Sequence, residues 1–121
     1  MLRVTHFEIH ADEPERAVEF YEKVFGWKIH KWQGPMEYWL VSTGPDGQPG
    51  INGGIMRREA GGTTYNTIDV PSVDEFIRKV GEAGGKVKAP KIAVPGVGYM
   101  AYCQDTEGNT FGIMEEDSSA K

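Results

Sequence analysis

Residues 4–26 read VTHFEIHADEPERAVEFYEKVFG, and this stretch decides the fold. Its beginning alternates polar and apolar residues, a period of two that predicts a strand with one packed face. The packed face would carry Phe7, Ile9 and Ala11. The opposite face would carry His6, Glu8 and His10. The strand is therefore predicted to separate a helix-covered side of a sheet from a polar side.

The end of the same stretch changes to helical periodicity. Apolar residues recur at helical spacing from about Glu13 to Phe25, which predicts a helix with one core face. Asp12 followed by Glu15 resembles a capping box, and Pro14 suits the first turn. Gly26 is expected to end the helix.

The second half of the chain repeats this order. A strand is expected over residues 65–70 and a helix over 72–83, with Ser72 and Glu75 as its capping pair. The remaining expected strands cover residues 27–32, 38–43, 51–57, 86–93, 97–103 and 110–115. The order strand, helix, three strands therefore occurs twice.

Short sequence matches support an internal duplication. Gly54-Ile55-Met56 recurs as Gly112-Ile113-Met114, and Glu19-Phe20 recurs as Glu75-Phe76. The fold class predicted is α+β, with two tandem βαβββ modules forming a cupped open sheet. The whole chain, 1–121, would form one domain from modules 1–60 and 61–117. Residues 118–121 would be a frayed tail.

Composition narrows the classes of function. The 121 residues carry a net charge of -5 and no basic stripe, which argues against a nucleic-acid partner. No apolar run reaches the length of a membrane helix, so no membrane partner is expected. The N-terminus lacks an apolar signal region, so we expect a cytoplasmic location. Cys103, the single cysteine, cannot form an intramolecular disulfide and is interpreted as a buried apolar residue.

Four segments together resemble the glyoxalase / bleomycin resistance / extradiol dioxygenase superfamily, also called vicinal oxygen chelate proteins. They are His6, residues 14–27, residues 84–87 and residues 105–111. The resemblance covers nearly the whole chain. It implies paired βαβββ modules around a cleft, frequent homodimers and, in enzymatic members, a divalent metal that acts as a Lewis acid.

The resemblance also implies four metal-ligand positions, of which this sequence keeps one. His6 matches the position on the first strand, but the last-strand positions are Gly54 and Gly112. The fourth position is Asn66 or Thr67. A complete metal site is therefore not expected, and no cofactor is predicted. A divalent metal stays an alternative, held by His6 with a neighbour on its strand, by Glu59, or by a dimer partner.

The predicted function is binding of a small molecule. The ligand cleft is expected to be lined by His6, Glu8, His10, Trp32, Tyr102, Gly54 and Gly112. One of Tyr38 and Trp39 would face the helix and the other the cleft. The two last-strand glycines either clear space for a bulky ligand or relieve packing. The alternative function is a metal-dependent lyase, isomerase or dioxygenase.

Overall fold

A computed structural model describes residues 2–59 and 61–121 of the chain. These residues form two compact units. The N-terminal unit comprises residues 6–65, and the C-terminal unit comprises residues 1–5 together with 66–121.

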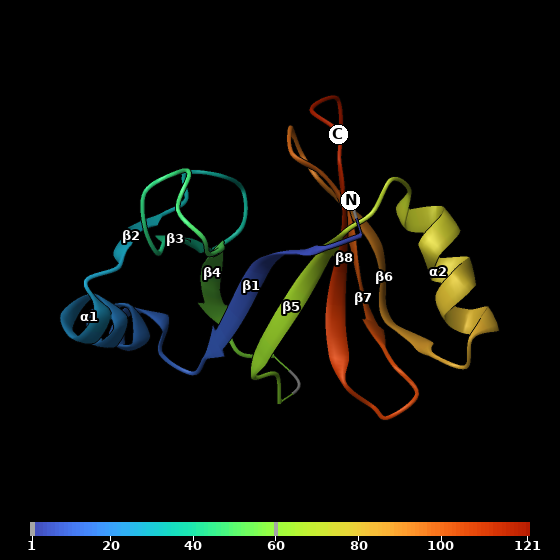
Figure 1. Cartoon of the computed structure of the whole chain (residues 1–121), viewed down its shortest axis with the longest axis horizontal. Coiled ribbons are helices and arrows are strands. Elements are labelled where there is room, and N and C mark those ends of the chain that lie inside the picture. Colours follow the sequence, from blue (N-terminus) through green and yellow to red (C-terminus); the bar gives the residue numbers. More distant parts are fainter. Residues whose placement is uncertain (1, 60) are drawn as a thin grey trace. The chain divides into compact units, whose positions relative to one another are not determined.

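The N-terminal unit has a four-stranded sheet in the order β2-β3-β4-β1. Strand β1 pairs in parallel with β4, and the other neighbouring pairs are antiparallel. The elements are β1 (Val4–Ala11, of which His6 onward belongs to this unit), α1 (Pro14–Phe25), β2 (Lys28–Lys31), β3 (Trp39–Ser42) and β4 (Asn52–Arg57). Figure 1 shows this succession in blue to green.

The C-terminal unit repeats the arrangement, with strand order β5-β8-β7-β6. Strand β5 pairs in parallel with β8, and the two remaining pairs are antiparallel. Helix α2 runs alongside β6 and β7 (Figure 1). The elements are β5 (Thr64–Asp69, of which Asn66 onward belongs to this unit), α2 (Val73–Glu82), β6 (Lys86–Val94), β7 (Gly98–Gln104) and β8 (Thr110–Glu116). The prediction of an α+β fold built from two tandem βαβββ modules is confirmed.

Each unit has its own apolar core between its helix and one face of its sheet. In the N-terminal unit, Ile55 is fully buried among residues of β1, β3 and α1. Phe7, Ile9 and Ala11 belong to this core, as the alternation in β1 predicted. In the C-terminal unit, Ile113 holds the corresponding position with 2% of its surface exposed. The recurring glycine-isoleucine-methionine triplets therefore occupy equivalent places.

The helix caps agree with the sequence at one helix and differ at the other. The Ser72 side chain accepts a hydrogen bond from the Glu75 backbone N–H, as predicted. At α1 the predicted capping box is wrong, because the N-cap residue is Glu13 and no side chain caps it. Asp12 instead forms an ion pair with Arg58, whose Nε lies 2.9 Å from its carboxylate. Gly26 ends α1 in the left-handed region (φ 71°), where glycine is unstrained.

The C-terminal residues are more ordered than the sequence suggested. Ala120 is only 5% exposed, and its carbonyl accepts a hydrogen bond from the Gly96 N–H. The Asp117 N–H also donates to the carbonyl of Val97. Two backbone bonds therefore fix this segment against the β6–β7 turn, in place of the frayed end expected from its polar composition.

Within residues 2–59 and 61–121, no helix combines the length and apolar character needed to cross a lipid bilayer.

Candidate functional site

Four polar side chains form a continuous hydrogen-bonded chain on the sheet face of the N-terminal unit that α1 does not cover. His6 Nε2 lies 2.8 Å from the hydroxyl oxygen of Tyr38, and that hydroxyl donates to Glu8 Oε2 at 3.2 Å. The other carboxylate oxygen of Glu8 lies 3.0 Å from His10 Nε2. We call His6, Tyr38, Glu8 and His10 the polar chain. Its three strand residues alternate along β1, which is why they share a face.

The proton positions in the polar chain follow from its chemistry. A phenol has one proton, and that of Tyr38 is used in the bond to Glu8. The Tyr38 oxygen must therefore accept its second hydrogen bond, so His6 Nε2 carries the proton it donates. A carboxylate only accepts, so His10 Nε2 also donates. Donors thus point from both directions toward Glu8.

Burial is the main influence on the protonation of His6 and Tyr38 in the polar chain. Burial lowers the pKa of His6 below its usual value, and the nearby Glu8 carboxylate only partly opposes the shift. The pKa of Tyr38 is raised, mainly by burial and further by the charge and hydrogen bond of Glu8. Near neutral pH, His6 is therefore uncharged and Tyr38 stays protonated. Glu8, with 4% of its surface exposed, is the carboxylate whose charge raises the pKa of both neighbours.

His10 adds a buried hydrogen-bonding atom to the cluster. The residue is 7% exposed, and its ring packs against Tyr65 with centroids 4.4 Å apart. Its Nδ1 atom is buried and has no hydrogen-bond partner among the residues that the structure describes. With Nε2 donating to Glu8, the Nδ1 of a neutral ring carries a lone pair and can accept a hydrogen bond.

Gly54 leaves the space that Tyr38 occupies. A Cβ atom on Gly54 would lie 2.0 Å from the Tyr38 hydroxyl oxygen and 2.1 Å from Cζ. Gly54 is also aligned with Glu8 on β1 and with Leu40 on β3. Of the two roles considered for this glycine, the structure shows packing, because a side chain of the protein itself fills the space.

The C-terminal unit contains the other two predicted cleft residues. Tyr102 on β7 pairs with Gly112 on β8, and Gly112 pairs with Thr67 on β5. A Cβ on Gly112 would lie 3.1 Å from the Thr67 hydroxyl. Thr67 is therefore aligned with Gly112 as Glu8 is aligned with Gly54.

Trp32 meets Tyr38 of the polar chain through its backbone, because its N–H donates to the Tyr38 carbonyl at 2.8 Å. Its ring lies over Gly34 in the connection between β2 and β3, where a Cβ on Gly34 would come within 2.2 Å of the ring. The role of Trp32 as a cleft residue stays a prediction.

The residues present do not fit the metal that the fold family implies. The side chains of His6 and Glu8 that could hold an ion already bond the Tyr38 hydroxyl, and Gly54 offers no ligand. Among residues 2–59 and 61–121, no three His, Cys, Asp or Glu side chains converge in a way that could hold an ion. The side chains of the polar chain thus form hydrogen bonds with one another.

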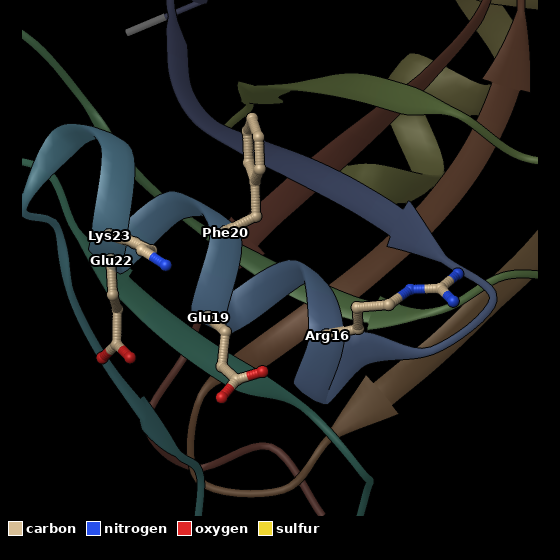
Figure 2. Close-up of a pocket in the computed structure, with 5 residues that line it drawn as sticks. All are labelled: Arg16, Glu19, Phe20, Glu22 and Lys23. Atoms are coloured by element: carbon tan, nitrogen blue, oxygen red, sulfur yellow. The ribbon is translucent and has the colours of Figure 1, made fainter.

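A hollow on the outer surface of α1 is separate from the polar chain. It is lined by Arg16, Glu19, Phe20, Glu22 and Lys23, all from one helix. Figure 2 shows these side chains diverging, with Phe20 directed away from the carboxylates of Glu19 and Glu22. Exposed charges of both signs that do not converge cannot fix a ligand in one orientation.

Sequence reasoning left one member of the polar chain undecided and missed one of its neighbours. It placed either Tyr38 or Trp39 on the cleft side, and the structure assigns Trp39 to the core and Tyr38 to the polar chain. Tyr65 was not predicted to contact His10. The alternation around residues 38 and 39 was the available signal, but it does not give the direction of a strand face.

The lowered pKa of His6 predicts a pH dependence of stability. Below the unfolded-state value near 6.5, the unfolded chain binds a proton that folded His6 resists, so stability falls as the pH drops through that value. Wild type is expected to lose more stability between pH 7.5 and 5.5 than His6→Gln. Urea unfolding followed by circular dichroism measures both losses.

The control for this pH experiment is His30→Gln, which removes an exposed histidine from β2. The control should keep the wild-type loss. An equal loss in wild type and His6→Gln would contradict the assignment of the effect to His6.

Comparison with known proteins agrees with this fold. A family model described as "Bleomycin resistance protein-like N-terminal" matches residues 3–44. The lactoylglutathione lyase of Escherichia coli O157:H7 is 26% identical over 132 residues, covering 99% of this chain and 97% of the relative. A lactoylglutathione lyase of Shigella flexneri matches equally well.

Two solved structures show the same fold at low identity. A methylmalonyl-CoA epimerase variant of Streptomyces coelicolor has a TM-score of 0.69 at 14% identity, covering 100% of this chain and 99% of its own. The epimerase of Mycobacterium tuberculosis has a TM-score of 0.66 at 13% identity, covering 93% and 87%. The family model, the curated relatives and the solved structures thus all point to the glyoxalase / vicinal oxygen chelate superfamily, which this chain resembles in sequence and in fold.

Proposed function

We propose that this protein binds a small molecule at the polar chain, without a metal ion held by its side chains. The observation that carries the proposal is the buried carboxylate of Glu8, whose two oxygens bond His10 and Tyr38. A protein retains a buried charge where hydrogen bonds offset its desolvation. Here those bonds end in imidazole rings that can accept further hydrogen bonds.

The chemistry of this face favours a ligand that donates hydrogen bonds. With His6 uncharged, the Glu8 carboxylate can attract a nearby cation and repel an anion. Leu40, aligned with Gly54, and Met56, aligned with His10, share this sheet face and supply apolar surface. The ligand class proposed is a small molecule with an apolar body and an amine or hydroxyl group.

Matched aromatic probes test this ligand class. We expect benzylamine and benzyl alcohol to raise the melting temperature, while benzoate does not. A probe at ten times its Kd would stabilise the protein by about 1.4 kcal/mol. The shift with benzylamine should be lost in Glu8→Gln, measured against the melting temperature of that variant without probe.

The matched control is Glu19→Gln, which neutralises an exposed carboxylate in the surface hollow of α1. This variant should keep the full shift. A preference for benzoate, or a benzylamine shift that survives in Glu8→Gln, would contradict the proposed ligand class.

A second candidate function is a metal-dependent lyase, isomerase or dioxygenase. The match to lactoylglutathione lyase over 99% of the chain favours it. This candidate requires His6 to bind an ion, and therefore to leave its hydrogen bond with Tyr38. The two candidates differ in metal content.

A further inference from the structure

The position of Tyr38 explains why the implied metal does not fit. In a metal-holding relative, an ion would join the first strand of a module to its last strand. In this chain the Tyr38 hydroxyl contacts Glu8 and His6 on the first strand. Its ring end occupies the space above Gly54 on the last strand, where a ligand side chain would begin.

We propose that the Tyr38 phenol stands in the place of the divalent ion in the N-terminal unit. The hydroxyl oxygen lies 2.8 Å from His6 Nε2 and 3.2 Å from Glu8 Oε2, so it bonds the implied ligand on the first strand, while the ring end fills the implied ligand position above Gly54 on the last strand. The inference rests on the proposed metal-free site and assigns Tyr38 as the residue that sets its specificity.

The connection between β2 and β3 holds Tyr38 in this position. The Trp32 N–H donates to the Tyr38 carbonyl at 2.8 Å, which closes the connection between β2 and β3. The neighbouring Glu37 forms an ion pair with Arg57 of β4, with Nε and Oε1 3.1 Å apart. Exposed ion pairs contribute little to stability, so the backbone bond and the packing over Gly54 are the main constraints.

The replacement changes what the site can recognise. A divalent ion attracts and polarises the oxygens of a ligand as a Lewis acid. A phenol whose proton is engaged by Glu8 offers an oxygen that accepts hydrogen bonds, with no positive charge. A phenol in place of the ion therefore favours ligands with N–H or O–H groups over ligands that chelate through paired oxygens.

Removing the phenol should uncover an ion site. His6 and Glu8 would then face a common vacancy, and each would need to move inward by about 1 Å to reach ordinary zinc distances. We expect Tyr38→Ala to bind Zn²⁺ at one site per chain, at least about tenfold more tightly than wild type. Isothermal titration with Zn²⁺ alone measures this, and the gain should disappear in Tyr38→Ala/His6→Ala.

Tyr38→Phe is the matched control. Its ring still fills the space over Gly54, so its Zn²⁺ affinity should stay at the wild-type level. Tyr38→Leu replaces Tyr38→Ala if the latter does not fold, because leucine also removes the ring end that blocks the ion position. The proposal is overturned if wild type already binds Zn²⁺ as tightly through His6, if no truncated variant gains affinity, or if Tyr38→Phe gains as much as Tyr38→Ala.

This titration uses no organic ligand. Failure of the aromatic probes would therefore contradict the proposed function without changing the Zn²⁺ result. Failure of the titration would contradict the role of Tyr38 without changing the probe result.

Discussion

A Glu8→Leu variant is expected to lose about 2–4 kcal/mol of unfolding free energy, because two donors lose their acceptor and each unsatisfied buried donor costs about 1–3 kcal/mol. Leucine has a similar size and keeps water out of the site. His10 Nε2 would then be buried without a partner, while the partly buried Tyr38 could turn toward water. Urea unfolding at pH 7.5 measures the loss.

The double variant Glu8→Leu/His10→Leu makes this prediction sharper. Removing both partners of a buried pair costs less than removing one, because no unpaired polar group remains. The double variant is therefore expected to be more stable than Glu8→Leu. If it loses the sum of the two single losses, Glu8 and His10 do not act as a hydrogen-bonded pair.

Ile55→Ala and Ile113→Ala are each expected to destabilise the protein by about 2–5 kcal/mol, the usual cost of truncating a buried isoleucine. Ile55 is fully buried and Ile113 is 2% exposed, each at the centre of the core of its own unit. Their equivalence in the duplicated triplets predicts losses of similar size. Urea unfolding gives both values.

Ile92→Ala provides the control for these core variants. Ile92 is 46% exposed on β6, so its truncation should cost much less than either core substitution. A core variant whose loss is as small as that of Ile92→Ala would contradict the assignment of that isoleucine to a core.

Much of the fold could be predicted from the sequence because the signals are local. The alternation from His6 to Ala11 gave the correct faces of β1, and the Ser72–Glu75 pair gave the correct cap of α2. The cap of α1 failed because a distant residue, Arg58, binds the Asp12 side chain. A tertiary contact of this kind has no signature in the neighbouring sequence.

The candidate site was predictable only in part, because it too depends on tertiary contacts. His6, Glu8 and His10 share a face by the period of a strand, which the sequence shows directly. Their connection through Tyr38 depends on strand register and on the packing of a phenol over Gly54. Both are properties of strands that lie far apart in the sequence, so alternation alone left Tyr38 and Trp39 undecided.

The metal content of wild-type protein purified without chelator tests the central claim most directly. If the Tyr38 phenol holds the centre of the site, mass spectrometry of the elements should find divalent ions only far below one per chain. One tightly bound divalent ion per chain, absent from His6→Ala, would contradict the account.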